Sequence, residues 1–276
     1  MSLVREGWIS LYGFGIGSSI LLFHLFSRSN FFYLYLFICV SHLLGSCFLI
    51  PKFLSLQSIN REIFQIGTFL GWGCSIGIIS LLNYSSNFGM YLIFLTLFHY
   101  SEYMVTAISN PKNISIDSYL INHGKEYGIA LFASWLEYFI EYYFFGKTFN
   151  YLSCLGVFLC LTGDITRKVA MLQAGASFNH IVQNDRKGDH TLITTGLYSI
   201  SRHPSYVGWF IWSTGTQIIL MNPICLIGYI IVTWCFFNQR IYYEEYTLLT
   251  FFGESYAEYM DTVPVGIPFI QGFRTK

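Results

Sequence analysis

The chain has 276 residues, of which 54% are hydrophobic, 20% aromatic and only 11% charged. Soluble domains carry about 25% charged residues, so this composition excludes a water-soluble globular protein and predicts an integral membrane protein. The formal net charge is zero, which gives no overall basic bias toward nucleic acid.

Eight apolar stretches are predicted to cross the bilayer as helices, which gives an all-α, polytopic membrane fold. The stretches are 8–26, 31–50, 63–82, 88–108, 127–145, 151–165, 205–221 and 224–237. The N-terminal sequence MSLVREGWIS lacks the basic region and cleavage site of a signal peptide, so the first stretch is expected to remain as a spanning helix. Four glycines in the third stretch favour close contact with neighbouring helices; they are Gly67, Gly71, Gly73 and Gly77.

The basic residues are sorted by side, which predicts the orientation. With eight spans both termini lie on one side, and that side would carry thirteen of the fifteen Lys and Arg residues. The other side would keep only Arg28 and Lys147. Lys and Arg concentrate in cytosolic loops, so both termini and the pocket region 183–245 are expected to face the cytosol.

The chain shows no repeat of 20–50 residues, which favours one compact membrane domain. Within it, residues 1–168 are expected to form six helices for scaffold and substrate access, and residues 169–276 the catalytic region. All seven cysteines fall in apolar stretches without a CxxC motif, so they are predicted to be small buried side chains. No metal site is expected.

Two glutamates four residues apart, Glu137 and Glu141, lie on one face of the fifth predicted span. Carboxylates inside a membrane are costly, so this face must meet other helices or a wet cavity. Two interpretations remain open: hydrogen bonding to Tyr or Trp partners in a structural role, or lining of the substrate path.

The last two stretches form a helical hairpin, 205–237, joined by Asn222-Pro223. About 17 residues at ~1.5 Å each just cross a core of ~30 Å, so the polar ends of both helices should meet on one side. These ends are RHPSYVGW, from Arg202, and NQRIYYEE, from Asn238. Residues 242–261 are expected to form a separate cytosolic helix packed on this pocket, ended by Pro264 and Pro268.

The residues at this mouth suit a zwitterionic nucleoside. Pro204 fits the first turn of a helix, whose unpaired N–H groups favour an anion. Glu244 and Glu245 can accept from ribose hydroxyls or an ammonium, and Arg240 can clamp a carboxylate. Alone, His203 is most simply an interfacial anchor and Arg240 a helix-end charge that reaches for water. It is their combination that indicates a binding site.

Three runs closely resemble the isoprenylcysteine carboxyl methyltransferase family: FNHIVQN, HTLITTGLYSISRHPSYVGWFIWSTGTQIILMNPI and FFNQRIYYEEYTLLTFFGESYAEYMDTVPVGIPFI. The resemblance is continuous from about residue 178 to 270. It implies transfer of a methyl group from S-adenosylmethionine to the α-carboxylate of a C-terminal farnesyl- or geranylgeranyl-cysteine in CaaX-processed proteins. It also implies a multi-pass protein of the endoplasmic reticulum membrane with a cytosolic active site. A monomer is expected, with no nucleic-acid partner.

The resemblance also implies the site residues. Arg240 would bind the substrate carboxylate and serve as the catalytic group. The residues implied to bind the cofactor are Gln183, His190, Thr191, Leu192, Ile193, Tyr198, His203, Pro204, Ser205, Tyr206 and Glu244. A carboxylate is already ionised at neutral pH, so this transfer needs alignment and removal of water rather than a general base. The prenyl chain prefers lipid and is expected to arrive sideways, past Trp209, Trp212 and the fifth span.

Three other interpretations compete with this one. An NADPH-dependent sterol reductase would need cations for a 2′-phosphate, whereas the hairpin closes with Glu244-Glu245. A phospholipid N-methyltransferase would act on a neutral amine, which gives Arg240 no partner. A transporter or scaffold would explain the spans but not the polar cluster at one mouth, and no inverted repeat is visible.

Overall fold

The computed structural model describes residues 3–26, 32–121, 124–183 and 191–273, and within these ranges every regular element is helical. The all-α prediction is therefore confirmed. The chain forms two compact units, Met1–Asn122 and His123–Lys276. The predicted boundary at residue 168 falls inside a helix of the second unit, α8 (Tyr151–Ala174).

The first unit is built around two long helices, α5 (Ser58–Asn83) and α6 (Ser86–Ser109), with α1 (Arg5–Ser18) packed along α5. Ser85 starts α6 by accepting a hydrogen bond from the Phe88 amide at 3.3 Å. The remaining elements are α2 (Ile20–Phe26), α3 (Phe32–Leu44), the π-helix η1 (Gly45–Leu49), α4 (Ile50–Phe53) and the short turns η2 (Pro111–Asn113) and η3 (Ile116–Tyr119).

The glycine face predicted for the third span is confirmed in α5. A Cβ on Gly67 would lie 2.6 Å from the Ser10 carbonyl oxygen of α1, and one on Gly77 would lie 3.0 Å from the Gly89 oxygen of α6. The backbones of neighbouring helices therefore touch at these positions, as close helix packing in lipid requires.

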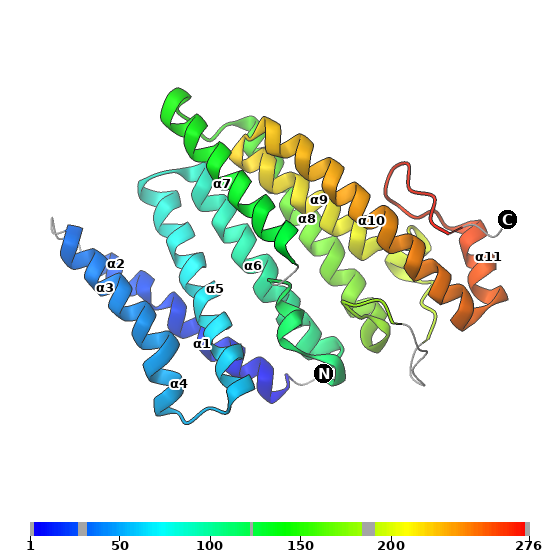
Figure 1. Ribbon diagram of the computed structural model, residues 1–276, viewed down its shortest axis with the longest axis horizontal. Coiled ribbons are helices and arrows are strands. Elements are labelled where there is room, and N and C mark those ends of the chain that lie inside the picture. The colour runs from blue at the N-terminus through cyan, green and yellow to red at the C-terminus, as the bar shows by residue number, and fades with distance from the viewer. Residues whose placement is uncertain (1–2, 27–31, 122–123, 184–190, 274–276) are drawn as a thin grey trace. The chain divides into compact units, whose positions relative to one another are not determined.

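The second unit holds α7 (Lys125–Phe145), α8, α9 (Pro204–Leu220), α10 (Pro223–Phe252) and α11 (Glu254–Thr262). Figure 1 shows α8, α9 and α10 side by side, with α9 in contact with both neighbours. Between α8 and α9 the described residues include two short 3-10 turns, η4 (Gly175–Ser177) and η5 (Gly196–Ser199). Prolines occupy the first turns of α9 and α10, where no backbone donor is needed.

The tight α9–α10 turn is held by polar side chains of α7 and of the segment just after it. Glu137 accepts from the Ile224 and Cys225 amides at 2.7 and 2.6 Å and so caps the start of α10. Lys147 donates to the Leu220 and Met221 carbonyls and forms an ion pair with Glu141 at 2.5 Å. Both glutamates thus have structural partners: Glu137 binds the start of α10, and Glu141 binds Lys147. These partners differ from the Tyr or Trp side chains that the structural interpretation expected.

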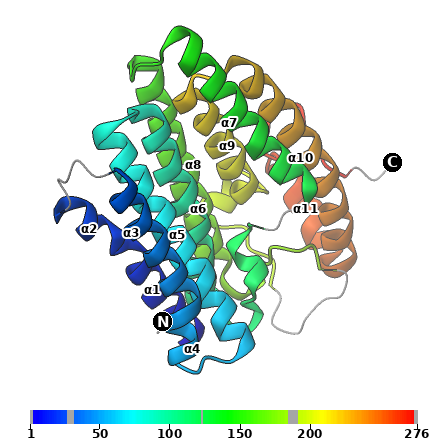
Figure 2. The same ribbon diagram turned by 60° about the vertical axis from the view of Figure 1, so that its left-hand side comes forward.

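The last predicted boundary was wrong. The stretch 224–237 does not end as a separate span, because α10 continues through Asn238–Glu245 to Phe252. The break falls at Gly253, whose φ of 55° ends the helix, and only Glu254–Thr262 forms the short α11 (Figure 2). No Gly or Pro lies between Pro223 and Gly253 except Gly228, so nothing local stops the helix earlier.

All eight predicted spans coincide with helices in the described ranges. By length and composition, α5, α6 and α10 are long and apolar enough to cross a membrane. Thirty residues of α10 measure ~45 Å, so one end extends beyond a core of ~30 Å. The cysteine prediction holds for Cys74 and Cys160, which are buried, and is wrong for Cys154 and Cys235, which lie exposed on apolar helices.

The contact between α8 and α9 yields a matched test of packing. A Cβ on Gly163 would lie 2.6 Å from the Gly208 oxygen and the Trp212 nitrogen, whereas one on Gly228 of α10 would have nothing within 4 Å. We expect Gly163→Ala to lower stability by about 1–3 kcal/mol through overpacking. Gly228→Ala should be neutral or stabilising, because alanine favours a helix. Melting temperatures in detergent compare the two variants, and an unchanged Gly163→Ala would contradict the close contact.

Candidate functional site

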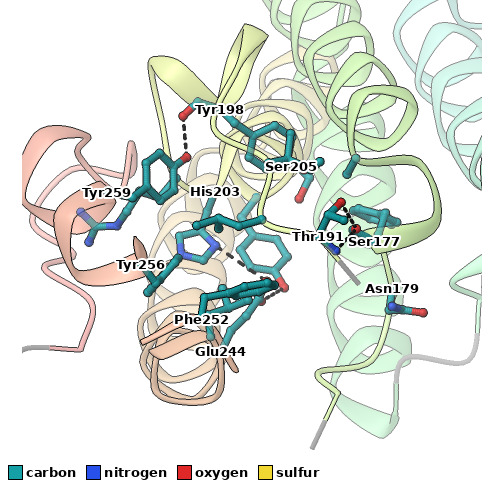
Figure 3. A pocket seen from close by; sticks show the side chains of 17 residues that line it. Ser177, Asn179, Thr191, Tyr198, His203, Ser205, Glu244, Phe252, Tyr256 and Tyr259 are labelled. Carbon is teal, nitrogen blue, oxygen red and sulfur yellow. Dashed lines mark hydrogen bonds and ion pairs between the residues drawn. The ribbon is translucent and has the colours of Figure 1, made fainter. Parts of the chain in front are cut away.

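A cavity opens within the second unit between the end of α8, the segment 191–198, the start of α9, the end of α10 and α11 (Figure 3). Its empty volume is about 630 Å³, including open solvent at its mouth. The lining residues are Ala174, Ser177, Phe178, Asn179, Thr191, Leu192, Ile193, Tyr198, Arg202, His203, Ser205, Tyr206, Glu244, Leu248, Phe252, Tyr256 and Tyr259.

Most residues expected to bind the cofactor meet at this cavity. Eight of them line it: Thr191, Leu192, Ile193, Tyr198, His203, Ser205, Tyr206 and Glu244. Pro204 is buried as the first residue of α9, and the Gln183 amide donates to the Ile181 carbonyl at 3.0 Å; neither is among the lining residues. His190 lies outside the described residues.

The two polar ends of the hairpin meet, as predicted. The His203 ring lies at the start of α9, with Nδ1 4.0 Å from Glu244 Oε1 and Nε2 3.1 Å from Glu245 Oε1. The Tyr206 ring stacks on that of His203 with centroids 5.5 Å apart, and its hydroxyl donates to Glu244 Oε2. Glu244 therefore presents a carboxylate to the cavity beside an aromatic pair (Figure 3).

Arg240 is one side chain removed from the cavity. Its Nε donates to the Tyr206 hydroxyl at 3.0 Å, and its Nη2 donates to the His180 carbonyl. The guanidinium carbon also lies 6.0 Å from the centre of the Phe236 ring, which is 44% exposed on α10. Arg240 thus connects the cavity, through Tyr206, to the apolar outer surface of α10.

The two adjacent glutamates have different environments, which the sequence did not reveal. Glu245 is fully buried and accepts from Arg202 Nε at 2.8 Å, from His203 and from the Phe273 amide at 2.7 Å. The expectation that it accepts from a bound ribose or ammonium is therefore wrong, because protein donors occupy it. Only Glu244 of the pair lines the cavity.

Several lining residues had no predicted role. Ser177 Oγ accepts from the Thr191 amide at 3.1 Å and so ties η4 to the segment after it. Tyr259 of α11 donates its hydroxyl to the Tyr198 carbonyl. Burial raises the pKa of Tyr259 to about 12, which keeps this donor protonated at neutral pH. These contacts join distant segments and have no local sequence signal.

Tyr256 of α11 places a hydroxyl in this wall, and this hydroxyl has no partner among the described residues. Its side chain is 1% exposed and lines the cavity, and the hydroxyl makes no hydrogen bond to any described residue. Burial, followed by the nearby Glu245 and Glu244 carboxylates, raises the pKa of Tyr256 above its usual range. A buried donor of this kind gains most from a ligand acceptor.

Arg167 of α8 is a buried residue that contacts the start of α9, next to the cavity. It is 2% exposed, donates to the Ser205 carbonyl at 3.2 Å and lies 4.8 Å from the centre of the Trp209 ring. The sequence counted it among the thirteen basic residues of the cytosolic side and did not predict its burial against the start of α9. A long α8 reaching Ala174 explains the difference, since residue 167 is not at the helix end.

Comparisons with known proteins agree on one family. The family model "Isoprenylcysteine carboxyl methyltransferase (ICMT) family" matches residues 155–250. Protein-S-isoprenylcysteine O-methyltransferase of Xenopus laevis is 43% identical over 99% of this chain and 98% of its own length. The Tribolium castaneum protein of that name is 44% identical, over 99% of both chains.

A solved structure matches the whole fold. It is described as the eukaryotic intramembrane Ras methyltransferase ICMT without a monobody, with a TM-score of 0.92 and 42% identity over 99% of this chain and 100% of that one. Since identity and coverage are both high, the family expected from the three sequence runs is confirmed. The chain belongs to the isoprenylcysteine carboxyl methyltransferase family.

Proposed function

We propose that this protein transfers a methyl group from S-adenosylmethionine to the C-terminal α-carboxylate of prenylated cysteine in CaaX-processed proteins. The observation that carries the proposal is the Arg240–Tyr206–Glu244 chain. Arg240 is a cation suited to bind the substrate carboxylate, and Glu244 is a carboxylate that lines the cavity. The Tyr206 side chain links the two. A methyltransfer site needs this proximity of the two substrates.

The cavity residues fit the methyl donor chemically. Glu244 and His203 offer acceptors for an ammonium or hydroxyl groups, and Tyr198 and Tyr206 supply aromatic faces. The unpartnered Tyr256 hydroxyl offers a donor for a ligand oxygen. The bound sulfonium supplies a reactive methyl group. The lining residues implied by the family resemblance, from Thr191 to Glu244, are the proposed donor contacts, and the resemblance adds Gln183, His190 and Pro204 to them.

Arg240 binds and orients the acceptor. Its two visible contacts, to Tyr206 and His180, fix the plane of the guanidinium. The planar fork suits a carboxylate bound by two parallel hydrogen bonds. Because a carboxylate needs no deprotonation at neutral pH, the chain's own work is alignment and exclusion of water.

The prenyl chain reaches Arg240 from lipid, past Phe236. This ring is exposed on α10 and lies beside the guanidinium, while Trp212 is 3% exposed and packed in the α8–α9 contact. A prenyl chain gains about 0.8 kcal/mol per buried CH₂ in the bilayer, so a lipid-side approach avoids extracting it. We place the protein in the endoplasmic reticulum membrane as a monomer crossing it eight times, with the cavity and both termini cytosolic, as the distribution of basic residues favours.

Arg240 yields the direct activity test, with radiolabelled S-adenosylmethionine and N-acetyl-farnesylcysteine as substrates. Arg240→Ala should lower kcat/KM at least about 100-fold, an effect of about 3 kcal/mol for a lost charged contact. Binding of S-adenosylhomocysteine should change less than about threefold, because the Tyr206–Glu244 bond remains. Arg240→Lys keeps the charge without the planar fork, so its kcat/KM should lie between those of the wild type and Arg240→Ala. Near-normal turnover in Arg240→Ala would contradict its role.

Tyr256 yields a separate test of where the donor binds. Tyr256→Phe should leave the melting temperature of the ligand-free protein unchanged or raised, because the hydroxyl makes no hydrogen bond within the described part of the chain. It should weaken S-adenosylhomocysteine binding by about three- to tenfold, the size of one hydrogen bond. Tyr259→Phe is the matched control, since it loses its bond to the Tyr198 carbonyl and should lower the melting temperature. Unchanged affinity in Tyr256→Phe, measured by calorimetry, would contradict this contact.

A further inference from the structure

Glu245 is a buried carboxylate beside the cavity, and protein donors contact both of its oxygens. It is 0% exposed, and its two oxygens accept three hydrogen bonds. Oε1 accepts from Arg202 Nε at 2.8 Å and from His203 Nε2 at 3.1 Å, and Oε2 accepts from the Phe273 amide at 2.7 Å. All its partners are donors, as an ionised carboxylate requires.

The contact with Glu245 determines which nitrogen of His203 carries the proton. An ionised carboxylate cannot donate, so Nε2 must present its hydrogen to Oε1. In the neutral ring, Nδ1 is then an acceptor. Nδ1 lies toward Glu244, 4.0 Å from its Oε1, and both residues line the cavity. The opposite tautomer would turn a nitrogen lone pair toward the Glu245 carboxylate and repel it.

The Glu245 carboxylate also binds the C-terminal segment, through the Phe273 amide. We name residues 263–273 the C-terminal strap. Arg202, the ion-pair partner of Glu245, also donates to the Met260, Val263 and Gln271 carbonyls. Gly272 has a φ of +74°, and a Cβ there would overlap the Glu245 carboxylate, so only glycine permits this close approach. The strap thus closes over Glu245 and holds it against His203.

We propose that Glu245 is a positioning residue for donor binding: anchored by Arg202 and the C-terminal strap, it fixes the orientation and tautomer of His203 so that Nδ1 accepts from the bound donor. This proposal rests on the proposed function, because it takes the donor to occupy the cavity. It gives the neighbouring glutamates separate roles: Glu244 contacts the ligand, and Glu245 acts through the imidazole.

The test compares Glu245→Gln with Trp234→Phe in the full-length protein. Trp234 Nε1 donates to the Pro268 carbonyl at 2.8 Å, so it anchors the same strap, but it is not among the lining residues of the described chain. S-adenosylhomocysteine affinity is measured by calorimetry and stability by thermal unfolding. Glu245→Gln should raise the dissociation constant about tenfold or more, as loss of an orienting partner does. Trp234→Phe should lower the melting temperature and leave the dissociation constant unchanged.

A merely structural role for Glu245 predicts a different pattern. The affinity would then fall in proportion to the melting temperature in both variants, or stay unchanged in Glu245→Gln, and either result overturns the proposal. If the wild-type protein does not bind S-adenosylhomocysteine, the proposed function itself fails. That outcome is visible before any variant is made.

A measurement on the unaltered protein covers the case in which Glu245→Gln does not fold. Nitrogen-15 NMR of histidine-labelled wild-type protein distinguishes the two imidazole nitrogens, with His203→Gln used to assign the signal. The expected spectrum has a proton on His203 Nε2 and none on Nδ1 at a pH where the ring is neutral. A neutral ring protonated on Nδ1 would overturn the proposal.

Discussion

The site depends on the buried contact of Glu245 with Arg202 and His203. Removing one partner of such a buried pair typically costs about 3–5 kcal/mol, because the other charge is left without compensation. Here the pair connects the start of α9, the last part of α10 and the C-terminal strap. Three segments that are far apart in the sequence therefore meet at one carboxylate, and the cavity wall is built on that junction.

The length of α10 places this junction on the same helix as other residues of the site. Because the helix does not stop at the end of its apolar stretch, Arg240, Glu244 and Glu245 lie on one continuous scaffold. Arg240 faces Tyr206 beside the exposed Phe236 ring, Glu244 faces the cavity, and Glu245 faces Arg202. Within six residues, one helix thus carries a guanidinium beside an exposed ring, a carboxylate that lines the cavity and a buried carboxylate that anchors other segments.

Much of this arrangement follows from the sequence. Each of the eight stretches chosen by apolar length lies on helical residues, and the pattern RHPSYVGW with NQRIYYEE located the mouth where the last two of these stretches meet. The sequence could not separate Glu244 from Glu245, because adjacent helical positions differ only in what packs against them. It placed the segment 242–261 on the pocket, but it could not show that Tyr256 and Tyr259 line the cavity or that the strap contacts Glu245, since these contacts depend on the break at Gly253. The burial of Arg167 could not be predicted for a similar reason: it depends on α9 packing across it.

The central claim is that the methyl donor and the prenylcysteine carboxylate are bound on either side of Tyr206. The most direct measurement is an experimental structure with S-adenosylhomocysteine and a farnesylcysteine substrate bound together. The account predicts that the sulfur lies in the cavity beside His203 and Glu244, with the carboxylate within hydrogen-bonding distance of Arg240 and directed at that sulfur. A nucleoside bound outside the cavity, or a carboxylate bound by residues other than Arg240, would contradict it.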